Sequence, residues 1–377
     1  MKLECEVCIV GGGPAGALLS CLLAEQGVST ILVERQSVAG KAFRGEILND
    51  EGQQVIQKHK LLEQIHEDYV LASTRIEYWK HQQQVKTVES AVGNVGVHIP
   101  QPHFLDALLK QASTYESFRY LAGTTVTALE GDSEQGYTGL TACDKNGDEV
   151  TIHSSVIVGA DGRYSTVRKL AQMPVTNIRH GYDLLWAKIT APAGWEPVTR
   201  LALVNGRQLS LFSQAEGYIQ IGWNVEEGSF PTLFKQSFEP FIQLLAEAFP
   251  DLEHNVYDRI HSWKDFVPLD IFSSRSETWS QNGLVLIGDA AHTMTPTGAF
   301  GLNAALKDAD VLASELLRMR QEGGYTAAGL KAFEDERRQT VTELQERQLT
   351  MESTFHEHFL QVRILQKSNK RLPINNI

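Results

Sequence analysis

The sequence predicts an α/β protein in which a discontinuous parallel-sheet domain surrounds an inserted antiparallel-sheet domain and is followed by a helical C-terminus. Three observations lead to this prediction. Residues 4–34 change from strand to helix to strand periodicity, the pattern of a βαβ unit. Apolar strands at 156–159 and 284–287 are each followed closely by Gly and Asp. Residues 176–230 alternate apolar and polar positions, which is typical of an antiparallel sheet with one solvated face.

Length and charge narrow the classes of function. The chain has 377 residues, enough for two domains at roughly 150 residues each. Its formal net charge is -12 and it has no long Lys/Arg run, so we expect no nucleic-acid partner. It has no uncharged apolar stretch of about 20 residues, so no integral membrane association is expected. Only four cysteines are present, which favours a reducing, cytoplasmic setting.

Two of those cysteines, Cys5 and Cys8, form a C-x-x-C motif. They lie in a predicted strand, where residues three apart face opposite sides, and no second cysteine pair follows. We therefore expect two core residues and no metal site.

The sequence GGGPAG at 11–16 joins the first strand to the first helix and matches G-x-G-x-x-G. Gly11 permits a tight turn, Gly13 lets a diphosphate approach the backbone, and Gly16 allows close helix–strand packing. The start of the following helix offers free N–H groups to phosphate. Glu34 ends the next strand, where a carboxylate can accept hydrogen bonds from both ribose hydroxyls. These features predict a dinucleotide site.

Two later segments resemble parts of the same site. In VIVGADGRYSTVR (156–168) the strand is followed by Asp161 and Gly162, although an ordinary turn explains this pair equally well. In LVLIGDAAHTMTPTGAFGLNAALKDADVLA (284–313) a buried strand delivers Asp289 at its carboxyl end, where ligands of open α/β sheets bind. A turn at 295–298 then leads into a helix opened by residues 301–303.

Together the three segments resemble the class A flavoprotein monooxygenases, the group of p-hydroxybenzoate hydroxylase. The resemblance covers about half of the chain. It implies an FAD-binding Rossmann-like domain of the glutathione-reductase type. It also implies FAD as cofactor, NADPH or NADH as a transient co-substrate, and hydroxylation of a small aromatic molecule by molecular oxygen through a flavin hydroperoxide. No second dinucleotide motif is needed, because the nicotinamide docks transiently in this family.

The resemblance also assigns roles by position. Glu34 is matched to the adenosine ribose, Arg35 to the cofactor entrance and Val126 to a backbone contact with adenine. Arg44 is matched to the FAD diphosphate, Gln101 to the cofactor and Asp161 to FAD. Asp289 is matched to the ribityl chain, and the amides of Leu302 and Asn303 to the flavin pyrimidine. The other implied cofactor positions are Gly11, Gly13, Pro14, Ala15, Gly16, Gly288, Pro296, Gly298 and Gly301.

The resemblance implies that the flavin performs the catalytic chemistry, so no protein acid or base is named. Arg44 and Pro296 are the candidate residues near the reactive site of the flavin. The chain has Thr295-Pro296 where relatives often have two prolines, a departure that concerns the shape of the oxygen pocket. His292 is interpreted as a packing or surface residue.

The predicted FAD domain comprises residues 1–69, 101–175 and 274–325. The substrate domain comprises 70–100 and 176–273, and 326–377 form C-terminal helices. The inserted sheet is expected to form the ceiling of the substrate site, although ordinary core packing explains each of its apolar residues singly. These are Trp186, Phe212, Tyr218, Ile221 and Trp223.

Three alternatives stay open. A flavin halogenase is disfavoured, because no two of the six tryptophans lie two residues apart. A reductase of the same fold, and a non-enzymatic flavin- or drug-binding protein, are separated from a hydroxylase by oxygen-dependent product formation and by ligand-stimulated NAD(P)H oxidation. We expect a monomer or a homodimer.

Overall fold

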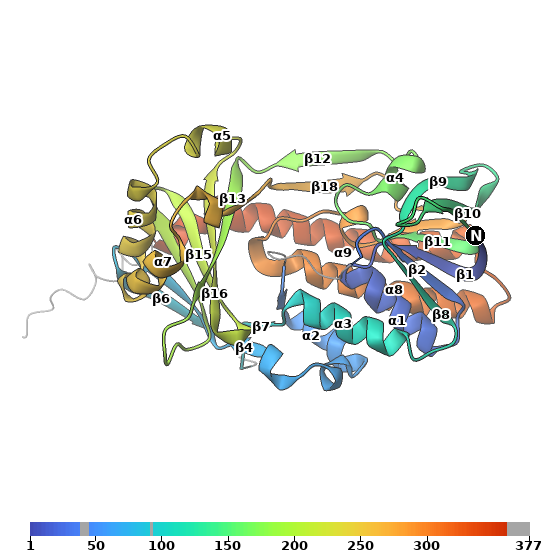
Figure 1. Ribbon diagram of the computed structural model, residues 1–377, viewed down its shortest axis with the longest axis horizontal. Helices are drawn as coiled ribbons and strands as arrows, with labels where there is room; N and C mark the ends of the chain where they lie inside the picture. The colour runs from blue at the N-terminus through green and yellow to red at the C-terminus, as the bar shows by residue number, and fades with distance from the viewer. Residues whose placement is uncertain (38–44, 91–92, 360–377) are drawn as a thin grey trace, which may run out of the picture. The chain divides into compact units, whose positions relative to one another are not determined.

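The structure is a computed structural model that describes residues 1–37, 45–90 and 93–359. The chain forms two compact units (Figure 1). The first unit contains Met1–Val70, Ile99–Arg179 and Phe272–Gln348, and the second contains Leu71–His98, His180–Ile271 and Leu349–Ile377. Among the described helices, none combines the length and the apolar character needed to cross a bilayer.

The first unit is built on a parallel sheet whose central strand is β1 (Lys2–Val10). β1 pairs in parallel with β2 (Thr30–Glu34) and with β11 (Glu149–Gly159). Outside these lie β8 (Phe118–Ala122) beside β2 and β20 (Leu284–Leu286) beside β11, both parallel. The last four residues of β1 are buried, as expected for a strand covered on both faces.

Shorter antiparallel strands complete this unit. β9 (Thr125–Asp132) and β10 (Gly136–Cys143) extend from β11, and β19 (Ser280–Gln281) pairs with β20. A separate ribbon joins β12 (Val175–Arg179) to β18 (Phe272–Ser276). The two-residue strand β3 (Ile47–Leu48) precedes α2.

Helices cover the sheet of the first unit. α1 (Pro14–Glu25) follows β1 directly and packs against both α3 (Gln101–Ala112) and α8 (Phe300–Gln321) (Figure 1). Pro14 begins α1 because its missing N–H needs no partner in a first turn. α2 (Asp50–Lys58) is capped by the Asn49 side chain, which accepts the Gly52 N–H at 3.2 Å. The short α4 (Thr166–Leu170) follows β11.

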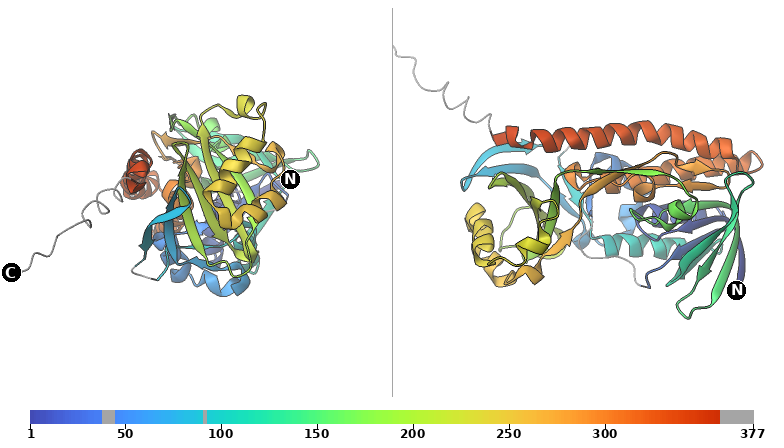
Figure 2. Two further views of the ribbon diagram at one scale, coloured as in Figure 1. Left: turned by 90° about the vertical axis from the view of Figure 1, so that its left-hand side faces the viewer. Right: turned by 90° about the horizontal axis from the view of Figure 1, so that it is seen from above.

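The long helix α9 (Ala327–Thr354) lies beside α8, and Figure 2 shows it in red. Arg337 on α9 contacts α8 through Asp308 at 2.8 Å and through the Ala304 carbonyl at 3.5 Å. The division between the two units falls inside this helix, after Gln348. Residues 327–348 are therefore part of the first unit, whereas 326–377 were predicted to form separate C-terminal helices.

The second unit contains a seven-stranded sheet in the order β17-β13-β16-β15-β14-β5-β6. Its neighbouring strands are antiparallel except β14 and β5, which are parallel. β4 and β7 form a separate antiparallel pair, and α5, α6 and α7 follow β16. The bounds are β4 (Leu71–Ser73), β5 (Arg75–Lys80), β6 (Gln83–Glu89), β7 (Gly96–His98), β13 (Tyr182–Thr190), β14 (Val198–Val204), β15 (Arg207–Gln214), β16 (Tyr218–Glu226), β17 (Val267–Leu269), α5 (Phe230–Leu233), α6 (Glu239–Ala248) and α7 (Glu253–Arg259).

The two faces of this sheet carry different side chains. Ile221 and Trp223 lie on the face that forms the buried core with α6 and α7. Trp186 pairs with Gly222, and Phe212 pairs with Gln220, so Trp186 and Phe212 lie on the opposite face. The expectation that Ile221 and Trp223 belong to a substrate ceiling is therefore wrong. Strand register sends alternate residues to opposite faces, and the two that face the helices are core.

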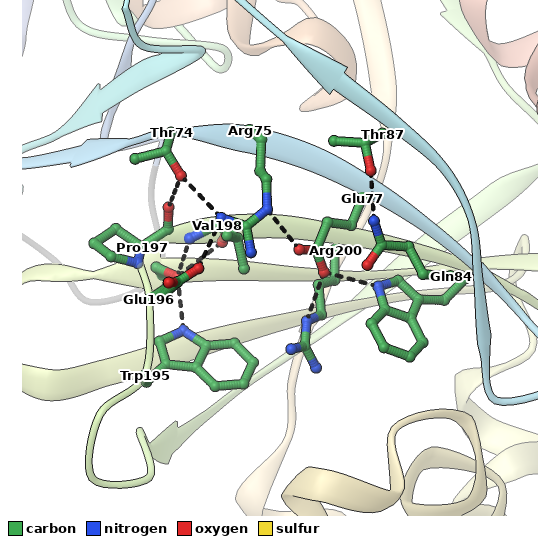
Figure 3. A network of polar contacts seen from close by, with 12 residues as sticks. Thr74, Arg75, Glu77, Gln84, Thr87, Trp195, Glu196, Pro197, Val198 and Arg200 are labelled. Carbon is green, nitrogen blue, oxygen red and sulfur yellow. Dashed lines mark hydrogen bonds and ion pairs between the residues drawn. The ribbon is translucent and has the colours of Figure 1, made fainter.

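A buried charge cluster stabilises the core side of this sheet (Figure 3). Glu77, which is 2% exposed, accepts hydrogen bonds from Arg75 at 2.8 Å, Trp79 at 3.0 Å and Arg200 at 3.1 Å. The Arg200 guanidinium also stacks on Trp79 and on Trp195, 4.7 and 4.3 Å from the ring centroids. These three hydrogen bonds offset the free-energy cost of burying the Glu77 carboxylate.

One local expectation about β1 is also wrong. The N–H groups of Glu6 and Val7 both donate to the Ser29 carbonyl, at 2.9 and 3.0 Å, which is the pattern of a β-bulge. A bulge turns consecutive residues toward the same side, so Cys5 and Cys8 do not face apart. A hydrogen bond with Cys5, together with burial, raises the pKa of the Cys8 thiol well above its ordinary value.

Candidate functional site

The glycine turn at 11–16 is shaped by close backbone approach. Gly11 has φ +109, and a Cβ there would collide with the Ala160 carbonyl; a Cβ at Gly16 would collide with the Gly11 carbonyl. The Gly11 N–H donates to Val33 and the Ala160 N–H donates to Val10, both at 2.8 Å. These bonds bring together the turns after β1 and β11 at the carboxyl edge of the sheet, the edge at which such folds bind ligands.

Gly13 has a different environment. A Cβ added there would meet no atom within 4 Å, so the space in front of it is open to a ligand. Gly13 is also the N-cap of α1, which has no side-chain cap and no acidic residue in its first turn. The free N–H groups and the positive end of the helix dipole are therefore available to an anion such as a diphosphate.

Glu34 lies beside the same turn. Its two carboxylate oxygens accept the N–H groups of Gly12 at 2.7 Å and Gln36 at 2.8 Å. Each oxygen keeps a further lone pair that is free to accept a ribose hydroxyl. The Glu34 carbonyl accepts the Thr124 N–H at 2.9 Å, which holds the start of β9 against the end of β2; Val126, two residues further on, is buried. Arg35 is exposed.

Asp161 mainly organises its own segment. Its carboxylate accepts the Ser165 hydroxyl at 2.5 Å and the N–H groups of Thr166 and Val167 at 2.6 and 3.1 Å, which caps α4. Burial raises the pKa of Asp161, although these hydrogen bonds act in the opposite direction. A direct contact of Asp161 with FAD remains a prediction.

Arg168 is a residue of this segment that received no role in the sequence analysis. It is 4% exposed, and its guanidinium donates to the Ala290 carbonyl at 2.5 Å and to the Arg163 carbonyl at 3.0 Å. Burial lowers its pKa. Arg168 thus joins the segment 156–168 to the segment 284–313. Its position at the end of VIVGADGRYSTVR was the only feature of the sequence that pointed to this role.

The turn that carries Asp289 rests on a buried ion network. Asp308 on α8 accepts the Gly288 N–H at 2.9 Å, contacts the His292 Nε2 at 2.6 Å and accepts the Arg337 Nε–H at 2.8 Å. Burial opposes ionisation of Asp308, but His292 and Arg337 outweigh it and hold the pKa low. His292 is therefore a buried structural partner. Asp289 is half-buried, and its carboxylate makes no hydrogen bond or ion pair with the described residues.

The start of α8 is also available to a ligand. Gly298 and Ala299 have φ +73 and +53, which turns the chain into the helix, and α8 has neither a side-chain cap nor an acidic residue in its first turn. The N–H groups of Phe300, Gly301 and Leu302 have no acceptor inside the helix. Pro296, two residues before Gly298, is exposed.

The Asn303 side chain has a bracing role. Its Nδ2 donates to the Ile47 carbonyl at 3.0 Å and to the Ala299 carbonyl at 2.5 Å, and its Oδ1 accepts the Asn49 N–H at 3.1 Å. A Cβ at Gly52 would collide with this amide, so Gly52 lets α2 approach it. The side chain thus joins the start of α8 to the segment 47–52.

A small hollow lies beside Leu302. Glu46 lines it and accepts the Gln101 N–H at 2.9 Å, which places a carboxylate at the start of α3. The Gln101 side-chain amide has no hydrogen-bond partner in the described part of the chain and lines the same hollow. Arg44 lies outside the described residues. Glu46 was not predicted, although it stands two residues after Arg44.

The chain is similar to known proteins in sequence and in fold. A family described as "FAD binding domain" matches residues 4–348. The chain is 33% identical over 312 residues to the 6-methylpretetramide 4-monooxygenase of Streptomyces rimosus, covering 81% of this chain and 73% of that protein. It is 24% identical over 352 residues to the digeranylgeranylglycerophospholipid reductase of Methanocella arvoryzae, covering 90% of this chain and 84% of that one.

A solved structure shares the fold. The crystal structure of PqsL from P. aeruginosa in complex with 2-aminobenzoylacetate matches with a TM-score of 0.83 and covers 96% of this chain and 100% of that chain. The two sequences are 17% identical, so this likeness concerns the arrangement of helices and strands.

Proposed function

This chain belongs to the FAD-binding family of class A flavoprotein monooxygenases, and we propose that it hydroxylates a flat, neutral, multi-ring aromatic molecule. It is an FAD-dependent monooxygenase with NAD(P)H as the electron donor. What the proposal adds is the chemical class of the substrate and the roles of individual side chains.

The residues of the first unit fit FAD. The open space at Gly13 and the uncapped start of α1 suit its diphosphate, and the spare lone pairs of Glu34 suit a ribose. The half-buried carboxylate of Asp289 suits the hydroxyls of the ribityl chain. When bound, FAD accepts a hydride from NAD(P)H and activates molecular oxygen. The uncapped N-terminus of α8 would stabilise negative charge on a flavin ring held beside it.

The substrate class is argued from the sheet of the second unit. A Cβ at Gly222 would collide with the Trp186 ring, so the missing side chain lets the indole lie flat on β16. The Phe212 ring lies 6.1 Å from it, at 56°. This pair of tilted aromatic rings is the observation that carries the proposal, because aromatic ring systems pack on one another in edge-to-face as well as offset-stacked arrangements. The neighbouring Ser210 and Gln220 are buried and neutral, which suits phenol and ketone oxygens better than a carboxylate.

The proposal is tested with purified holoprotein and a panel of ring systems that includes 6-methylpretetramide, the compound named in the Streptomyces relative. We expect one multi-ring compound to stimulate NAD(P)H oxidation and to gain one oxygen atom from labelled O₂. The variant Trp186→Ala should raise KM for that compound. Trp223→Phe, on the opposite face of the sheet, is the matched control and should leave KM unchanged.

One relative supports a second candidate. The reductase from Methanocella arvoryzae aligns with 90% of this chain, so reduction of a carbon–carbon double bond is the main alternative. A product that gains hydrogen and no labelled oxygen, formed equally well under anaerobic conditions, would favour reduction. We propose a monomer or homodimer, which sedimentation of the holoprotein distinguishes.

A further inference from the structure

Helix α9 holds the loop Thr293–Gly298 through two buried glutamines. The Gln345 side chain donates to the Thr293 carbonyl at 3.1 Å and to the Ser274 carbonyl at 3.0 Å. The Gln348 side chain donates to the Thr295 carbonyl at 2.8 Å and to the Thr297 carbonyl at 2.6 Å. The two glutamines are 3% and 0% exposed. Three alternate carbonyls of one loop are thus bound by one turn of one helix.

These contacts fix the loop because its backbone has little regular structure of its own. Residues 292–296 belong to no helix or strand. The Thr293 carbonyl also accepts the Ser274 N–H at 3.0 Å, and the two glutamines add side-chain donors along the loop. The orientation of each amide is determined by its neighbours. Gln345 accepts the Arg275 Nε–H at 2.7 Å through its oxygen, which turns its NH₂ group toward the loop. Gln348 meets two carbonyls, so its NH₂ group must face them.

The Gln348 contact is made at a cost. Its Oε1 is buried and accepts no hydrogen bond within the described residues. A buried amide oxygen without a donor is unfavourable. A leucine or methionine would fill the same volume without that loss, so packing alone does not require glutamine here. The two hydrogen bonds to the loop are the feature that neither leucine nor methionine supplies.

The loop leads directly to the candidate flavin site. It contains Pro296 and ends next to Ala299, the N-cap of α8. The same face of α9 carries Arg337, which holds Asp308 and thereby the Gly288 N–H. α9 therefore binds the segment 284–313 in two ways. It binds three carbonyls of the loop directly, and it supports the Gly288 N–H indirectly through Asp308.

We propose that Gln345 and Gln348 are positioning residues of the flavin site: they set the loop Thr293–Gly298 and, through it, the place and direction of the α8 N-terminus. The inference rests on the proposed placement of the flavin ring at that terminus. On this basis α9 acts on the cofactor site through the loop that it holds.

The test compares Gln348→Met and Gln345→Met with Gln339→Met, whose glutamine is exposed on the same helix. Each variant is purified as holoprotein and as apoprotein. We expect FAD binding, followed by flavin fluorescence, to weaken about tenfold when both loop bonds of Gln348 are lost. The midpoint potential of the bound flavin should become more negative, because a displaced helix N-terminus stabilises the reduced, anionic ring less. Gln339→Met should match the wild type in both measurements.

A lower melting temperature with unchanged FAD affinity and midpoint potential would overturn the inference, because it would show a structural role only. If Gln348→Met yields no folded protein, Gln345→Met, which keeps the Gln348 bonds, decides by the same two measurements. Asp289→Asn separates failure of this inference from failure of the proposed site. If Asp289→Asn weakens FAD binding and the glutamine variants do not, only the positioning role fails. If Asp289→Asn also has no effect, the placement of FAD fails.

Discussion

Replacing Gly13 with alanine should separate the stability of the glycine turn from its ligand binding. Gly13 has φ -72 and ψ -179, a conformation open to any residue, and an added Cβ meets no protein atom within 4 Å. The apoprotein should therefore keep its stability or gain about 0.4–1 kcal/mol, because alanine reduces the entropy of the unfolded chain. FAD binding should weaken at least tenfold, about 1.4 kcal/mol, since the methyl group occupies the space in which the diphosphate approaches the backbone.

Gly16→Ala provides the contrast. Its Cβ would collide with the Gly11 carbonyl, a backbone atom that cannot move without changing the turn. The apoprotein should lose about 1–3 kcal/mol. Thermal melting of the apoproteins measures stability, and titration with FAD by fluorescence measures affinity. If Gly13→Ala binds FAD as tightly as the wild type, the diphosphate does not lie at this position and the argument from the open glycine is refuted.

Two further predictions concern buried charge. Glu77→Gln removes a carboxylate that accepts three hydrogen bonds and should lower the free energy of unfolding by about 2–3 kcal/mol; Glu196→Gln, which removes an ion pair of the exposed Glu196 with the same Arg75, should cost about 1 kcal/mol or less in chemical denaturation. Burial opposes ionisation of Asp310, but His59, Lys58 and Lys307 outweigh it and lower its pKa, so its contribution to stability is present above an unfolded pKa of about 3.9 and is lost as the pH falls through the folded value. Asp310→Asn should therefore be less stable than the wild type at pH 7 and should lose less stability between pH 5 and pH 2; equal acid slopes would contradict this role.

The sequence by itself determined the cofactor class and the four parallel strands that lead to the predicted site, β1, β2, β11 and β20. The turn at 11–16, the carboxylate of Glu34 and the strand that leads to Asp289 are local patterns, and each is specified by the residues within a few positions of it. Family resemblance added the order of the three segments. Local sequence is sufficient to predict these features, because a βαβ unit forms its turn, helix start and strand end from contiguous residues.

The tertiary structure alone decided which side chains hold those patterns in place. Arg168 reaches the Ala290 carbonyl, Asp308 binds the Gly288 N–H, and Gln348 binds the loop at Thr295. An arginine or glutamine in a helix shows no partner in the sequence, because the partner is chosen by how the helix packs. The faces of the second sheet were decided in the same way. Trp186 and Trp223 are both aromatic strand residues, and only the register of β13 and β16 separates the proposed aromatic surface from ordinary core.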